Sequence, residues 1–424
     1  MSPLAAVGTY VIPTFFALVV FLGDVGIAIR ALIFIVILVV GAGIAWAAWF
    51  RTSFWFDADG DLRVATGVLF RNERRVQVSR LQAVDIHRPL VARIIGLAEL
   101  RPEMAGGESG KVRLSYLTES DAQVLRNELL AHSAGLMLED GETAATPAPE
   151  QILVRVPGPD LAVSGLLDIG TILAIGVGIG VVVFTLVWGN PAPLIGLILA
   201  GGGLVFGSAT YFMTYFDFTL AESPDGLRLR YGLLNTRSQT VPPGRVQAVR
   251  ISRPILWKRK GWVRLQVNVA GYAGGSDDSA AGTMLLPVAP RELALAVLQR
   301  VLPGVDVEAV NLVSAPPRAR RRAPFQGRRL AAGHDERVMV IRGGWLTHTL
   351  DVVPHARMQS LRITQGPWQR TLGLASLHLD STPGPVSPVA LHRDAGQVRG
   401  ELEAEVRRAR AARAAFRPER WMRS

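Results

Sequence analysis

Residues 232–247 read GLLNTRSQTVPPGRVQ, and the same landmarks occur at two other places in the chain. Residues 67–82 read GVLFRNERRVQVSRLQ, and residues 344–359 read GWLTHTLDVVPHARMQ. Each stretch opens on Gly-x-Leu and closes on Arg-x-Gln, with an offset of 165 residues between the first two copies (67 to 232) and 112 between the last two (232 to 344). Because constant internal spacing marks repeated domains, we predict three copies of one domain.

The residues after each Arg-x-Gln favour a small β-rich fold. A glycine and then a leucine recur at fixed spacing behind the glutamine: Gly96, Gly261 and Gly373, followed by Leu100, Leu265 and Leu377. Short alternating runs joined by turns such as Asp59-Gly60 are typical of β-hairpins. Amphipathic helices are predicted at residues 120–132, 291–301 and 394–412, so we expect each copy to be a β-barrel or sandwich closed by a C-terminal helix.

Four apolar stretches of about 20 residues predict membrane spans, since this length crosses a hydrocarbon core of about 30 Å. They cover residues 4–22, 31–50, 166–188 and 192–216. The joins within each pair are short, which predicts two α-helical transmembrane hairpins. Few residues precede the first stretch, so an upstream start of translation is left open.

Basic residues at the ends of these stretches predict their orientation. The joins within the hairpins hold Arg30, balanced by Asp24, whereas the other flanks hold Arg51, Arg155 and Arg228. Flanks rich in arginine face the cytoplasm. We therefore expect a multi-pass plasma-membrane protein with its soluble domains in the cytoplasm.

The repeated landmarks resemble the bacterial PH domain type 2 (DUF304) family, and within it the YdbT-like multi-domain membrane proteins. Gly96-Leu97-Ala98 and Gly373-Leu374-Ala375 follow the pattern of that family, whereas the second copy departs from it with Gly261-Trp262-Val263. The third copy also lacks a preceding hairpin. The resemblance implies PH-like domains without established chemistry, and assembly with a second copy or with a protein partner such as a shorter single-domain relative.

The predicted organisation alternates membrane segments with PH-like domains. It consists of transmembrane hairpin 1 (1–50), PH-like domain 1 (51–135), a linker (136–165), transmembrane hairpin 2 (166–216), PH-like domain 2 (217–304), an Arg/Pro-rich linker (305–330), PH-like domain 3 (331–415) and a basic tail (416–424).

The repeated polar residues are the first candidates for binding: Arg80, Gln82, Arg245, Gln247, Arg357 and Gln359. Arginine at a fixed place could bind lipid phosphates or the carboxylates of a partner. The alternative is a structural role, in which these side chains satisfy backbone groups of a turn that each copy shares.

A second candidate surface is the arginine run ahead of the third copy: Arg318, Arg320, Arg321, Arg322, Arg328 and Arg329. Polybasic segments near a bilayer are attracted to anionic lipid, which also suits the formal net charge of +11. The alternatives are a solvated helix face and simple retention of charge in the cytoplasm.

Catalytic motifs are not expected in this chain. The absence of cysteine excludes disulfides, thiolate metal sites and thiol nucleophiles. Residues 106–111 read GGESGK, but Ala105 and Val112 stand where a phosphate-binding loop needs glycine and Ser or Thr. The seven histidines show no metal-ligand spacing. We therefore expect no catalytic residue, no metal and no cofactor, and no nucleic-acid partner.

Together these patterns predict a non-enzymatic, membrane-anchored adaptor or scaffold that presents PH-like domains for protein association or self-association. Membrane lipids are its other expected partner. Two alternatives stay open: a component of a transporter or channel, and a sensor that binds anionic lipid.

Overall fold

The computed structural model describes residues 53–57, 61–66, 72–78, 81–104, 114–133, 150–189, 207–223, 226–270 and 284–415, with a few isolated helical positions between 29 and 43. The chain divides into two compact units, residues 1–146 and 147–424. Each unit is described on its own.

The first unit contains the first copy of the repeat. Its elements are β1 (Ser53–Phe56), β2 (Leu62–Thr66), β3 (Asn72–Val76), β4 (Leu81–Arg88), α3 (Leu90–Ile94), β5 (Leu97–Met104), β6 (Leu114–Thr118) and α4 (Glu119–Ser133). Strands β1, β2 and β3 form one antiparallel sheet, and β4, β5 and β6 are likewise paired in order. One hydrophobic core joins the strands to α4, with Leu62, Leu100 and Leu129 fully buried.

The second copy opens the second unit. Its elements are β7 (Gln151–Arg155), α5 (Gly158–Leu166), α6 (Ile169–Trp188), β8 (Thr219–Ser223), β9 (Gly226–Tyr231), β10 (Thr236–Val241), η3 (Pro243–Arg245), β11 (Val246–Pro254), η4 (Ile255–Lys260), β12 (Trp262–Val269), β13 (Met284–Pro290) and α8 (Arg291–Val301). Residues 207–215, just before β8, are also helical.

The third copy repeats this order of elements. It consists of β14 (Val313–Ser314), α9 (Ala319–Arg322), β15 (Ala331–His334), β16 (Val338–Gly343), β17 (Thr347–Pro354), η6 (His355–Arg357), β18 (Ser360–Thr364), α10 (Pro367–Thr371), β19 (Leu374–Asp380), β20 (Val389–Asp394) and α11 (Val398–Ala415). The predicted repetition of β-rich domains, each ending on a helix, is therefore confirmed.

The first strand of the second and third copies lies further upstream than the sequence pattern indicates. β7 pairs with β8 although α5 and α6 separate the two strands, and β14 pairs with β15 across α9. The stretches predicted as linkers (136–165 and 305–330) thus contribute strands to the sheets. Helix α6, the candidate membrane span, is inserted after the first strand of the second copy and does not precede that copy.

One described helix is long and apolar enough to span a membrane, Gly170–Trp188 within α6, and its side chains are not covered by the rest of the protein. Asp168 caps this helix by accepting a hydrogen bond from the backbone N of Gly170 (3.0 Å), and Gly189 ends it in the left-handed conformation. Of the other predicted spans, residues 4–22, nearly all of 31–50 and most of 192–216 lie outside the described residues. The two predicted hairpins are therefore not confirmed, and the described part of the chain contains one candidate span.

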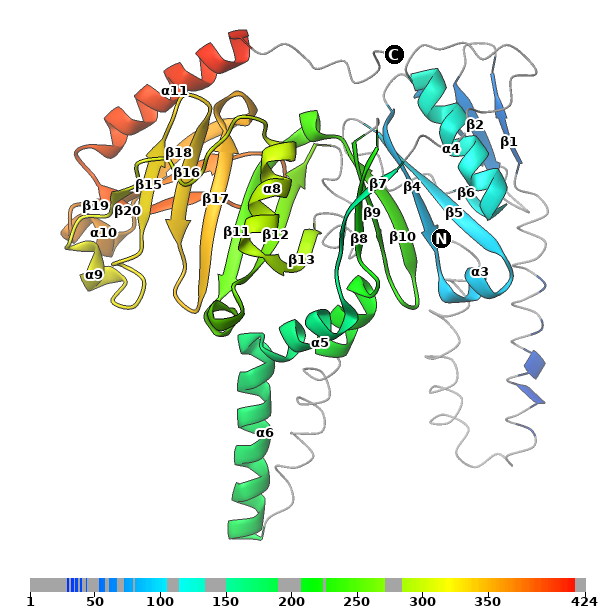
Figure 1. Ribbon diagram of the computed structural model, residues 1–424, viewed down its shortest axis with the longest axis horizontal. Helices are drawn as coiled ribbons and strands as arrows, with labels where there is room; N and C mark the ends of the chain where they lie inside the picture. The colour runs from blue at the N-terminus through cyan, green and yellow to red at the C-terminus, as the bar shows by residue number, and fades with distance from the viewer. Residues whose placement is uncertain are drawn as a thin grey trace. The chain divides into compact units, whose positions relative to one another are not determined.

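The second and third copies share one sheet. Its strand order is β13-β12-β11-β17-β16-β15-β14, so that β11 of the second copy lies next to β17 of the third (Figure 1). The hydrophobic cores are shared as well, because Val338, Val340 and Val352 from the third copy belong to the core of the second. Ala248 of the second copy lies in turn in the core of the third.

Candidate protein interface

The contact between β11 and β17 shows how one PH-like copy binds another. The two strands are antiparallel, and their register runs from Val249 opposite Val352 to Pro254 opposite Thr347. Pairing of strand edges relies on backbone hydrogen bonds, and the side chains that face each other across the pair give it specificity. The two copies are therefore joined by backbone pairing and by the side chains that face each other across the two strands.

An ion pair between Arg250 and Asp351 joins the two strands. The two residues lie directly opposite each other in the register, with Nε to Oδ1 at 2.6 Å and Nη2 to Oδ2 at 2.7 Å. Arg250 also donates hydrogen bonds to the carbonyl oxygens of Pro385 (3.1 Å) and Ser387 (3.3 Å). Burial raises the pKa of the Asp351 carboxyl, whereas the hydrogen bonds and charge of Arg250 act in the opposite direction.

Asn268 forms a second contact between the copies. This fully buried residue of β12 donates from Nδ2 to the carbonyl oxygens of Val386 (2.7 Å) and Thr382 (3.1 Å), and its Oδ1 accepts from the backbone N of Val386 (2.9 Å). The loop between β19 and β20 is thus fastened to the second copy, which makes the pair of domains a single folded body.

Two of the repeated arginines, Arg245 and Arg357, lie at the ends of the short helices η3 and η6. The carbonyl oxygen of Arg245 accepts from Gln247 Nε2 and from the backbone N of Ala270, both at 3.0 Å. Arg357 donates to the carbonyl oxygen of Gly244, so it links the third copy to the second. The predicted binding role of the repeated arginines and glutamines stays a prediction.

The other residues of this candidate set are less informative. Gln359 is exposed, and its backbone N donates to the carbonyl oxygen of Asp380 (2.9 Å). Gln82 lies in β4, but its side chain is outside the described part, as is all of Arg80.

The candidate arginines of the run at 318–329 are arranged along the third copy. Arg318 pairs with Asp394 and donates to the carbonyl oxygen of Gly373 (3.1 Å), and Arg322 lies over the ring of Trp368 at 5.8 Å. Arg329 donates to the carbonyl oxygen of Trp345 (3.2 Å). The remaining members are exposed: Arg320, Arg321 and Arg328.

Strand β18 is the counterpart of β11 in the third copy, but its outer edge is open. Within the described residues β18 pairs with β19 alone. The offset of 112 that aligns Arg245 with Arg357 places Arg362 at the position of Arg250. Arg362 is exposed and pairs with Asp380 of β19 (Nε to Oδ2, 3.1 Å), on its own sheet. We call residues 360–364 the open edge.

Comparison with known proteins agrees with this architecture. The sequence model of the Bacterial PH domain matches three times, at residues 11–133, 172–305 and 297–413. The chain belongs to the bacterial PH domain family. It is similar to UPF0699 transmembrane protein YdbT of Bacillus subtilis (strain 168), with 22% identity over 297 residues that cover 63% of this chain and 59% of that relative. The match thus spans less than two thirds of the relative's length. No solved structure matches.

The third bacterial PH domain also contains a buried charged group that the sequence did not reveal. His355 and Glu405 are both buried, and His355 Nδ1 pairs with the Glu405 carboxylate while its Nε2 lies 3.1 Å from the carbonyl oxygen of Asp335. Arg408 Nη1 lies 2.9 Å from Glu405 Oε2. Burial works to raise the pKa of Glu405, but the hydrogen bonds and charges of His355 and Arg408 prevail and lower it. This cluster fixes α11 to the domain.

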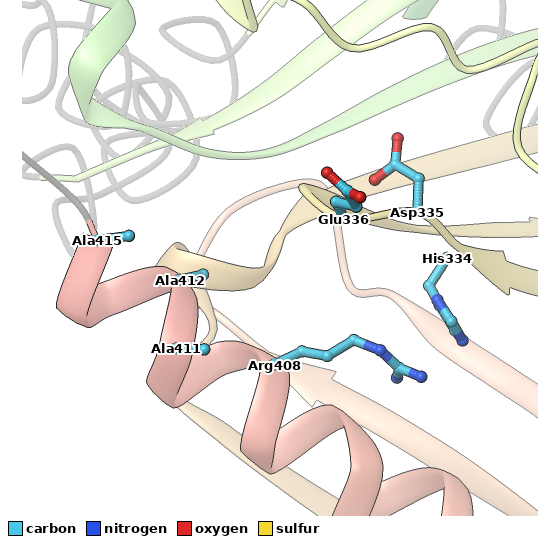
Figure 2. Close-up of a pocket in the computed structure, with 7 residues that line it drawn as sticks. All are labelled: His334, Asp335, Glu336, Arg408, Ala411, Ala412 and Ala415. Carbon is cyan, nitrogen blue, oxygen red and sulfur yellow. The ribbon is translucent and has the colours of Figure 1, made fainter.

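Two hollows lie beside this cluster. One, of about 690 Å³, is bordered by the β15–β16 turn and by Ala411, Ala412 and Ala415 on one face of α11 (Figure 2). The other, of about 450 Å³, lies between α11 and the sheet, with Arg393 and Glu401 on its wall. Arg393 and Glu401 bind each other at 2.8 Å. Among the described residues, no group of three His, Cys, Asp or Glu side chains could hold a metal ion.

Proposed function

We propose that this protein is a non-enzymatic scaffold, anchored in the plasma membrane with its PH-like domains in the cytoplasm, that binds partner proteins by pairing strand edges. The observation that supports this most strongly is the β11–β17 contact, in which one bacterial PH domain already holds another through a shared sheet. The open edge at β18 offers the same kind of surface to a further protein.

The charge of the open edge indicates the chemistry of its partner. Arg362 stands where Arg250 binds Asp351, so a matching strand should carry a carboxylate opposite Arg362. The repeat offsets place Arg74 of β3 at the position of Asp351. A second copy of this chain docking through β3 would therefore set arginine against arginine, which disfavours such self-association. The partner we propose is a separate PH-like protein with an acidic residue on its edge strand.

The composition of the membrane helix favours an anchor over a transport path. Residues 169–188 contain no ionisable side chain, and Thr185 turns its hydroxyl to the carbonyl oxygen of Val181 (2.9 Å). Ionisable groups inside a membrane usually mark the paths of ions and polar solutes. The described span therefore supports the anchoring function and gives no support to the transporter alternative.

Purification of the tagged full chain from gently solubilised native membranes tests the proposal. The wild-type chain should bring down a PH-like partner, and Arg362→Glu should reduce its recovery at least tenfold because two acidic strands would then face each other. Arg399→Glu, an equal change at an exposed position of α11, should leave recovery unchanged. Equal recovery with both variants would contradict the role of the open edge.

A further inference from the structure

The third copy holds α9 at the place in the sheet where the second copy holds its membrane helix. In the second copy the chain leaves β7, forms α5 and α6, and returns in β8, while in the third copy it leaves β14, forms α9 and returns in β15. Equivalent hydrogen bonds close both insertions, from Val156 N to Phe218 O (2.9 Å) and from Ala315 N to Leu330 O (2.8 Å). The arginine-rich insertion therefore leaves the sheet at the end from which α6 extends (Figure 1).

Helix η4 lies at that end too. Its Trp257 is fully buried and donates from Nε1 to the carbonyl oxygen of Ser164 in α5 (3.2 Å), one short turn ahead of the membrane helix. Ile255 and Leu256 stand next to this anchor, yet 41% and 38% of their surfaces remain exposed. These two apolar residues thus lie near the start of the candidate membrane span with about two fifths of their surface exposed.

Two exposed aromatic residues extend this apolar surface. The backbone N of Ile255 donates to the carbonyl oxygen of Leu346 (2.8 Å), which joins η4 to the β16–β17 turn that carries Trp345. The ring of Trp345 stacks on Phe325 with centroids 4.5 Å apart. Trp345 is 47% exposed and Phe325 is 67% exposed. We call Ile255, Leu256, Phe325 and Trp345 the aromatic face.

Positive charge surrounds the aromatic face. Arg329 binds the carbonyl oxygen of Trp345, and Lys258 and Lys260 of η4 are two of the three lysines in the chain. The pKa of His348, two residues after Leu346, is lowered by burial and then by the positive charges of Arg329, Arg253 and Lys258. These cations are therefore close enough to act together on one imidazole.

We propose that the aromatic face and its cations bind the headgroup layer of an anionic phospholipid bilayer, so that the fused second and third domains lie against the membrane. Tryptophan favours the boundary between lipid and water, and anionic headgroups attract basic residues close to the surface. The position beside α5 brings this surface to the membrane as soon as α6 is inserted. Insertion of α6 necessarily places the bilayer next to the N-terminal end of this helix. No observation places a partner protein there.

Single-cysteine labelling of the full chain tests this directly, because the natural sequence contains no cysteine. A polarity-sensitive fluorophore on Leu256→Cys should report burial in nanodiscs of phosphatidylcholine with phosphatidylglycerol. Glu336→Cys serves as the matched control, since Glu336 lies in the turn at the opposite end of β16 from Trp345. We expect at least a threefold lower accessibility to a water-soluble quencher at Leu256→Cys than at Glu336→Cys.

The dependence of this protection on lipid charge distinguishes binding to an anionic bilayer from other causes of protection. Protection of the Leu256→Cys label should weaken in nanodiscs of phosphatidylcholine alone, and it should weaken likewise when Lys258→Glu and Lys260→Glu are added in anionic nanodiscs. An unchanged thermal unfolding midpoint, measured in detergent, shows that the charge-reversed chain still folds. Equal quenching at both labels in anionic nanodiscs overturns the proposal. Protection of equal strength in nanodiscs of phosphatidylcholine alone also overturns it, because anionic headgroups would then play no part in the binding.

Discussion

Arg250 and Asp351 face each other across two strands that belong to different copies of the repeat, and their two hydrogen bonds measure 2.6 and 2.7 Å. The pair lies where the cores of the two domains meet, and the Asp351 side chain is almost completely buried. A buried charge that loses its partner is costly. The second and third domains should therefore unfold together.

Replacing Asp351 by asparagine should destabilise both domains. The change removes the counter-charge of Arg250, whose side chain is 21% exposed. Loss of one partner from a fully buried ion pair typically costs about 3–5 kcal/mol, which is the upper bound here. Denaturant unfolding of the full chain in mild detergent measures the loss. Asp380→Asn, which removes the exposed partner of Arg362, is the control and should cost less than about 1 kcal/mol. Similar losses of unfolding free energy for the two variants would mean that the Arg250–Asp351 pair contributes no more to stability than an exposed ion pair.

Replacing Asn268 by alanine should release the loop between β19 and β20 by local opening, which needs less free energy than global unfolding. The variant leaves the backbone N of Val386 without its acceptor, at a cost of about 1–3 kcal/mol. Amide hydrogen exchange in residues 381–388 should speed up by at least tenfold, whereas exchange in β12 should change little. Ser381→Ala removes one weaker contact of Asn268 and is expected to have a small effect. Unchanged exchange in Asn268→Ala would rule out the anchoring role.

Acid should loosen α11 through Glu405. Because its pKa is lowered in the folded protein, the stabilisation by this carboxylate is complete above the usual pKa of a glutamate and is lost as pH falls through the lowered value. Hydrogen exchange in α11 should therefore accelerate in acid for the wild-type chain. Glu405→Gln should already exchange faster at neutral pH and respond less to acid. If both chains showed the same acid response, another group would be responsible.

The glycine of the Gly-x-Leu opening should not tolerate alanine. Gly344 has φ +84°, and an added Cβ would overlap the carbonyl oxygen of Thr347. We expect Gly344→Ala to destabilise the third domain by about 1–3 kcal/mol in the unfolding assay. Gly400→Ala, in α11 with open space around it, should be neutral or slightly stabilising. Equal stability of the two variants would contradict the strained-turn explanation.

The repeat was visible in the sequence because turns impose strict local requirements. Gly232 and Gly344 recur since both have positive φ and both approach a carbonyl oxygen too closely for a side chain. The arginine of the Arg-x-Gln landmark recurs at the end of a short helix in the second and third copies, η3 and η6. Local geometry of this kind repeats at fixed spacing, and a single sequence is enough to detect it.

Contacts between distant parts of the chain left no such signal. β7 and β8 are partners, but helices α5 and α6 separate them in the sequence, so β7 resembled a linker. Arg250 and Asp351 lie on strands whose pairing depends on how two domains dock, and His355 meets Glu405 only after α11 has folded back. Alternation of polar and apolar residues predicts a strand but does not identify its neighbour.

Photo-crosslinking from the open edge in native membranes tests the scaffold function most directly. A crosslinking residue introduced at Ile363 of β18, which is more than a third exposed, should capture one major partner with a PH-like sequence and an acidic edge strand. The same residue at Arg399 on α11 should not capture that partner. Capture of lipid alone from Ile363, or of the same proteins from both positions, would contradict strand-edge binding as the function of this protein.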